Sequence, residues 1–88
     1  MRKHVATSSA ENFELRYFET VSQCERGEAD FYGVCVGMYI DGSLMEETES
    51  GSISEDSEQV LEVIKKLSEN SVTPVVLCEI LDEMVSCL

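Results

Sequence analysis

The sequence has little of what marks several common classes of protein. Its 88 residues include only six Lys and Arg against eighteen Asp and Glu, which gives a formal charge of −12. Such a surface repels phosphate, which argues against direct binding of nucleic acid or of an anionic membrane. No apolar run approaches the roughly 20 residues that cross a bilayer. The basic start is followed by polar residues rather than an apolar segment, so we expect no secretion signal and a cytoplasmic protein.

Histidine is nearly absent, and the catalytic motifs that depend on it are absent too. His4 is the single histidine, so a Cys–His pair would require the N-terminal segment to fold back onto a cysteine. Carboxylates are abundant, but a catalytic pair needs one desolvated member with a raised pKa. The crowded acids Glu46, Glu47 and Glu49 look solvated. We therefore expect a protein that is not an enzyme.

No cofactor or metal motif is present. The calcium-binding EF-hand loop does not occur, and Gly33 and Gly37 lie in a strand pattern rather than before a helix, as a phosphate-binding loop requires. Successive cysteines are separated by 11, 43 and 9 residues and include no C-x₂₋₄-C pair. We expect ordinary thiols, with Cys35 and Cys78 in the core, and leave a disulfide or a metal site as less favoured alternatives. The four cysteines are Cys24, Cys35, Cys78 and Cys87.

The first half of the chain predicts strands. Residues 1–11 show no periodicity and are expected to form a flexible N-terminal arm, followed by a single α+β domain over residues 12–88. Apolar residues alternate from Phe13 and again over residues 32–40, as in half-buried strands. The polar stretch over residues 23–30 is interpreted as the loop between them.

A hairpin turn and a third strand follow. Asp41 and Gly42 predict a type I′ turn, because both central positions of that turn need a positive φ. The third strand is expected over residues 43–53, and the charged residues near its middle are typical of an edge strand. Gly33 and Gly37 share one face of the second strand and predict a bulge, a strong twist or a close backbone approach.

Two helices are predicted after the strands. Ser54 is the expected N-cap of the first helix, about 14 residues long, and Asn70 is its expected left-handed terminator. Thr73 as N-cap and Pro74 at the first helical position mark the start of the second helix. The predicted fold is therefore α+β in the order β-β-β-α-α. It has a three-stranded antiparallel sheet with two C-terminal helices packed on one face.

The negative charge is concentrated in one region. Residues 27–64 hold ten acids and no base, whereas residues 1–26 are neutral overall. Complementary charge raises association rates and selects partners. We predict that the acidic region binds a basic protein, such as a nucleic-acid-binding enzyme whose substrate the acidic face would mimic. The predicted partner-binding residues are Asp41, Glu46, Glu47, Glu49, Glu55, Asp56 and Glu58.

Other interpretations of the surface stay open. In one, the acidity serves only solubility, in a bacterial housekeeping domain or a homodimeric scaffold. A homodimer through the C-terminal helix is an alternative, because Val75 and Val76 extend the apolar arc of that helix. In another, the uncovered edge of the third strand accepts a strand from a partner or from a second copy.

The part of the chain from the second predicted strand to the second helix carries a family resemblance. Its elements, over residues 31–85, look like those of a family of short uncharacterised proteins from Gram-positive anaerobic bacteria. This resemblance implies a β-hairpin followed by helices and no known activity. In general type, the short acidic chain is also similar to small acidic inhibitors encoded by bacteriophages, including those that block CRISPR nucleases. The residues that carry the family resemblance are Tyr32–Val34, Ile53–Asp56, Val60–Leu67 and Val72–Pro74, with Leu77 and Ile80.

Overall fold

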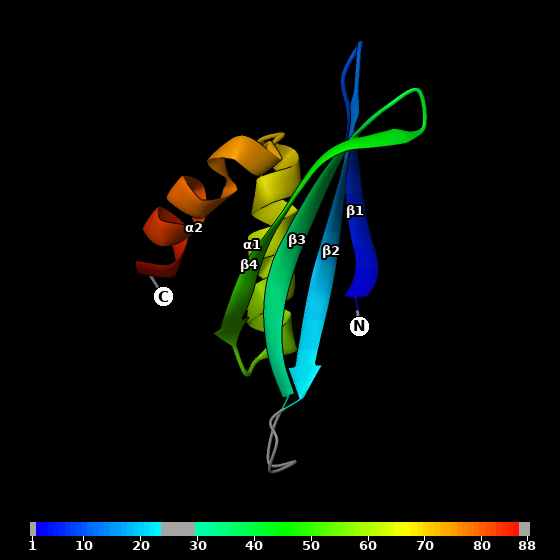
Figure 1. The fold of residues 1–88 in the computed structure, drawn as a ribbon. Coiled ribbons are helices and arrows are strands. Elements are labelled where there is room, and N and C mark those ends of the chain that lie inside the picture. The colour runs from blue at the N-terminus through cyan, green and yellow to red at the C-terminus, as the bar shows by residue number, and fades with distance from the viewer. Residues whose placement is uncertain (1, 24–29, 87–88) are drawn as a thin grey trace.

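An antiparallel sheet with helices on one face makes up the protein, as seen in a computed structural model (Figure 1). The structure describes the backbone of residues 2–23 and 30–86. Neighbouring strands of the sheet are antiparallel, and their order in the sheet follows the chain. The strands are β1 (Arg2–Ser9), β2 (Glu14–Gln23), β3 (Asp30–Ile40) and β4 (Ser43–Ser54).

The prediction of three strands is wrong, because residues 2–9 form a fourth strand at the edge of the sheet. This strand, β1, was expected to be part of a flexible arm. It pairs with β2 from Arg2 to Ser9, with a register shift at Val5. Strand pairing is made by the backbone, so an edge strand whose side chains are mostly exposed leaves little periodic signal. Val5 and Ala6 pack against the core.

The β3–β4 hairpin agrees with its prediction. Asp41 and Gly42 have φ values of 51° and 82°, as a type I′ turn needs. β4 is an edge strand, as expected. At Gly33 an added Cβ would overlap the Gly51 carbonyl oxygen and lie 2.8 Å from Thr20 Oγ1. The register of β4 shifts around this position, so Gly33 provides the close backbone approach that the sequence predicted.

The helices follow the sheet as α1 (Ser57–Glu69), a 3₁₀ turn η1 (Pro74–Val76) and α2 (Leu77–Ser86). The predicted cap at Ser54 is wrong by two residues. Asp56 is the N-cap of α1, and its carboxylate accepts a hydrogen bond from the backbone N–H of Glu58 at 3.0 Å.

The first helix ends, and the next helical segment begins, at the predicted residues, but the caps differ from those predicted. Asn70 caps α1 with a φ of −99°, and the left-handed residue is Ser71, with a φ of 50°. Thr73 occupies the N-cap position without a side-chain capping bond. Pro74 opens the 3₁₀ turn rather than the α-helix itself, so α2 begins three residues later.

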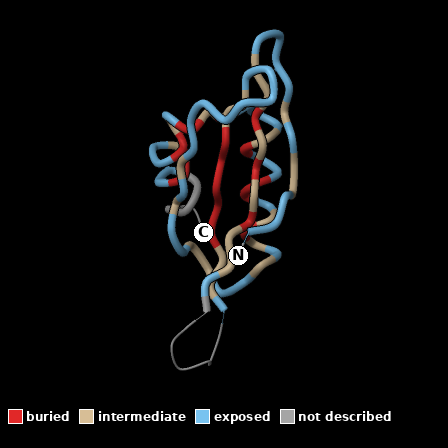
Figure 2. The backbone as a smooth tube through the Cα atoms, turned by 45° about the vertical axis from the view of Figure 1, so that its right-hand side comes forward, coloured by how far each residue is buried: buried red, intermediate tan, exposed pale blue. Residues whose placement is uncertain are grey.

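The core lies between the sheet and the helices. The Tyr17 hydroxyl on β2 donates a hydrogen bond to the Val72 carbonyl at 2.9 Å, and burial raises the pKa of Tyr17 to about 12. Figure 2 shows buried residues along the strands and helices, whereas the turns that join β1 to β2 and β3 to β4 are largely exposed. The central core residues are Leu15, Tyr17, Val34, Val36, Val60, Ile64, Leu67, Leu77 and Leu81.

The cysteines differ in their surroundings. Cys35 is a buried free thiol, as predicted, whereas Cys78 is exposed on α2 and not in the core. Cys24 and Cys87 lie outside the described residues, as does most of the loop predicted over residues 23–30.

Candidate protein-binding surface

β4 presents its three glutamates on both faces of the sheet. Glu47 and Glu49 pair with β3 residues that alternate with the core residues of that strand. They therefore lie on the face away from the helices, which we call the open face. Glu46 pairs with Met38, which packs against the core, and so lies on the helix-covered face. All three glutamates are exposed, but they do not form a single row.

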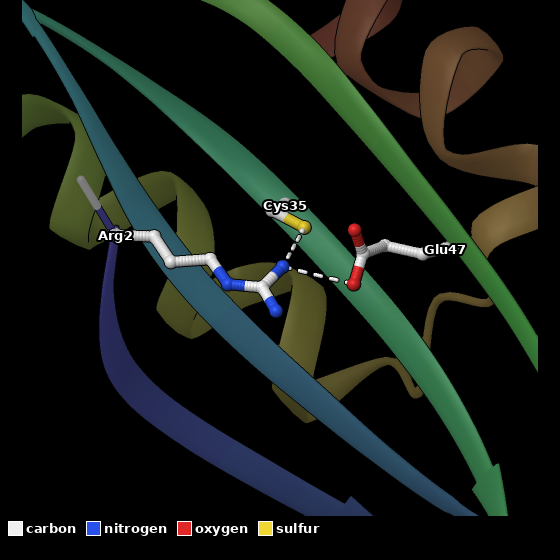
Figure 3. Close-up of polar contacts among 3 residues, drawn as sticks. All are labelled: Arg2, Cys35 and Glu47. Atoms are coloured by element: carbon white, nitrogen blue, oxygen red, sulfur yellow. Dashed lines mark hydrogen bonds and ion pairs between the residues drawn. The ribbon is translucent and has the colours of Figure 1, made fainter. Parts of the chain in front are cut away.

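Glu47 has a basic partner, because Arg2 reaches to it across the open face from β1. Arg2 Nη1 donates to Glu47 Oε2 at 2.8 Å and to Cys35 Sγ at 3.4 Å (Figure 3). The guanidinium carbon lies 4.6 Å from the centroid of the Phe18 ring on β2. The hydrogen bond to Glu47 raises the pKa of Arg2. These contacts, which we call the Arg2 clamp, connect the two edges of the sheet.

The Arg2 clamp also covers the Cys35 thiol. Cys35 has no exposed surface, although it points to the open face. Burial raises the pKa of Cys35, and the negative charge of Glu47 raises it further, while Arg2 acts in the opposite direction. A buried neutral thiol is inaccessible and is a weak nucleophile. The Arg2 clamp therefore has the character of a structural contact rather than of a catalytic thiol site.

Glu19 is a buried acid that the sequence interpretation missed. It is 4% exposed on the helix-covered face of β2, and Ser57 Oγ donates to its carboxylate at 2.9 Å. Ser57 is the first residue of α1, where a negative charge is favourable because of the helix dipole. The signal in the sequence was an acid at an apolar position of the alternating stretch from Phe13 to Val21. Glu19 thus fastens the start of α1 to the sheet.

Two buried reactive groups, the Glu19 carboxylate and the Cys35 thiol, lie away from four cavities where a small substrate could bind. The cavities among the described residues include these four, whose volumes are about 230 to 330 Å³. Neither Glu19 nor Cys35 lines any of these four. Within residues 2–23 and 30–86, no group of three or more His, Cys, Asp or Glu side chains is placed to hold a metal ion.

The seven predicted binding residues are spread along β4 and beyond both of its ends. Asp41 lies in the hairpin turn, whereas Glu55, Asp56 and Glu58 follow the opposite end of the strand (Figure 1). Twelve strand residues extend about 40 Å, so the two ends cannot serve one small site. Asp56 is already engaged as the cap of α1. The structure therefore gathers only the three glutamates in the middle of β4.

The charge in the middle of β4 is largely uncompensated. Glu47 forms an ion pair with Arg2, and its side chain keeps 32% of its surface exposed. Glu46 and Glu49 form no ion pair with any described residue. β4 itself contains no base. This strand is thus an exposed edge with negative charge on both faces.

Comparison with known proteins places the chain in a family. A family of unknown function, DUF6514, matches residues 1–87, so the chain belongs to this family. The match confirms the predicted likeness to an uncharacterised family and extends it beyond residues 31–85. No curated protein and no solved structure matches the chain. Of the helices that the structure describes, none is long and apolar enough to cross a membrane.

Proposed function

We propose that this member of the DUF6514 family is a non-enzymatic protein-binding module that recognises a basic protein through β4. The observation that carries the proposal is the character of this edge strand. It is exposed, it contains three glutamates and no base, and two of the three have no ion pair among the described residues. Glutamates on an edge oppose pairing with the same strand of another copy. The same charge attracts a basic surface over a distance of several ångströms.

The proposed partner class is a basic protein that handles nucleic acid, because such proteins expose Lys- and Arg-rich surfaces that bind phosphates. Alternate residues on one face of a strand repeat about every 6.8 Å. Glu47 and Glu49 on the open face therefore present negative charge on the scale of neighbouring backbone phosphates. In this proposal the protein acts in the cytoplasm of a bacterium as an inhibitor that occupies the phosphate-binding surface, as small phage-encoded inhibitors do.

The competing function is solubility alone. If the acids only keep the chain in solution, the position of each exposed acid is unimportant and only the total charge matters. If β4 is a recognition strand, acids on β4 matter more than equal numbers of acids elsewhere. The two functions therefore predict different results for charge changes at different places.

Two charge-matched variants make this comparison. Glu46→Lys combined with Glu49→Lys changes β4, and Glu79→Lys combined with Glu83→Lys makes the same charge change on exposed residues of α2. The probe is a fluorescent lysine decapeptide, whose affinity is measured by anisotropy at low and at high salt. We expect the β4 variant to lose about tenfold or more in affinity at low salt, which is about 1.4 kcal/mol. The α2 variant should lose much less, and equal losses would contradict the proposal.

A further inference from the structure

Exposed apolar side chains are concentrated at the end of the β3–β4 hairpin. Among the described residues, four large apolar side chains are exposed, and three of them lie within residues 40–45. Ile40 is 37% exposed, Leu44 48% and Met45 57%. The fourth, Val75, is 74% exposed on η1. Ile40 alternates with Tyr39 and therefore lies on the helix-covered face, whereas Leu44 pairs with Tyr39 on the open face and Met45 follows it directly. A single exposed apolar side chain is ordinary, whereas neighbouring ones such as Leu44 and Met45, which we call the cluster, are typical of a contact site.

Neighbouring residues of the β3–β4 hairpin hold Leu44 in position. Leu44 pairs with Tyr39, and both side chains lie over Gly37 on the open face. A Cβ added at Gly37 would lie 3.0 Å from Tyr39 Cε1 and 3.2 Å from Leu44 Cδ1. Met45 is the extra residue where the register of β4 shifts. Leu44 is therefore held in place by its neighbours while half of its surface stays in contact with water.

The charges around the cluster are negative. Asp41 lies in the turn and Glu46 follows Met45 directly, whereas Glu47 is paired with Arg2. Arg16 stacks on the Tyr39 ring, with its guanidinium carbon 4.1 Å from the centroid, but it is neutralised by an ion pair with Glu14 at 2.5 Å. A second copy of the chain would bring the same carboxylates together, and like charges facing each other oppose association. The surface thus fits a partner that carries both apolar and basic side chains.

We infer that Leu44 and Met45 form an apolar anchor site for an amphipathic basic segment of the partner. This inference rests on the proposed function and makes it more specific. A few buried apolar contacts supply most of the affinity of an interface, while surrounding charges select the partner and speed its arrival. The flexible thioether of Met45 adapts to different apolar surfaces. Binding therefore has a salt-dependent component from the β4 acids and a salt-resistant component from the hairpin end.

Two peptides of equal charge separate these components. One alternates Leu and Lys, and the other alternates Ser and Lys. Leu44→Ser combined with Met45→Ser removes the proposed anchor, and Val75→Ser removes an even more exposed apolar side chain outside it. We expect the wild-type chain to bind the Leu–Lys peptide about tenfold or more tightly than the Ser–Lys peptide at high salt. The hairpin variant should lose this preference and the Val75 variant should keep it, while thermal unfolding checks that each variant is folded.

Each outcome decides the inference. Equal affinities of the wild-type chain for the two peptides, or an unchanged preference in the hairpin variant, would overturn the anchor site. Neither result affects recognition by the β4 acids, which fails only if the two charge-matched variants lose affinity equally. Sedimentation of the chain alone tests whether a second copy of the chain occupies this site instead of a basic partner. A concentration-dependent dimer that is lost in the hairpin variant would identify a second copy at this site and overturn the inference.

Discussion

The two edge strands of the sheet use their side chains in opposite ways. β1 contains Arg2 and Lys3 and no acid, and it is fastened to the rest of the molecule. Arg2 folds inward over the open face to Glu47, and Val5 and Ala6 pack against the core.

β4 contains three glutamates and no base, and its residues 43–47 are exposed. Two of its glutamates form no ion pair with a described residue. Arg2 of β1 is paired within the molecule, whereas Glu46 and Glu49 of β4 form no ion pair with a described residue, which is why we propose β4 as the recognition edge.

The largest expected effect comes from breaking the attachment of β4. In Gly33→Ala, the new Cβ would overlap the Gly51 carbonyl oxygen, so either β3 or β4 must move. We expect the free energy of unfolding to fall by about 2 to 3 kcal/mol. Urea denaturation followed by circular dichroism measures this loss.

Gly37→Ala is the matched control for that variant, because it lies on the same face of the same strand. Its Cβ would meet the side chains of Tyr39 and Leu44, which can turn aside, rather than a backbone atom. The expected loss is about 1 kcal/mol or less. Similar losses in the two variants would show that the contact between Gly33 and Gly51 does not determine how β4 is attached.

A smaller effect is expected from opening the Arg2 clamp on β1. Arg2→Ala removes the ion pair with Glu47 and the contact with the Phe18 ring. Because both charged groups are partly exposed, the loss of stability should be about 1 kcal/mol or less. Glu47 is freed at the same time, so affinity for the lysine decapeptide should rise severalfold.

Lys3→Ala is the control for the charge change, since Lys3 is an exposed residue of the same strand with no ion pair to a described residue. It should raise the peptide affinity less than Arg2→Ala does. If the two variants gave the same affinity, the Arg2 clamp would not be shielding Glu47, and the contrast between the two edges would rest on net charge alone.

Local chemistry explains which parts of the fold were predictable. The turn at Asp41 and Gly42 and the start at Pro74 depend on the backbone preferences of one or two residues. The helix cap was misplaced because Ser54 and Asp56 are both good capping residues. The Ser54 hydroxyl instead accepts from the Asp56 N–H and donates to Gln59 Oε1.

Non-local contacts explain what was missed. β1 is defined by backbone pairing with β2, and its exposed side chains carry no alternation. The Arg2 clamp joins residues 45 positions apart, which no local pattern reveals. The glutamates of β4 were predicted, but their division between two faces depends on the register with β3. The apolar residues beside the turn were visible in the sequence, but their exposure depends on how far the hairpin extends beyond the helices (Figure 1).

Backbone hydrogen exchange, with and without the lysine decapeptide, tests the central claim most directly. Amide exchange reports local opening and coverage strand by strand. The account predicts that the peptide slows exchange in β4, with the strongest effect over residues 46–49, and leaves β1 unchanged. Equal slowing in both edge strands, or slowing confined to α2, would contradict the claim that β4 is the recognition edge.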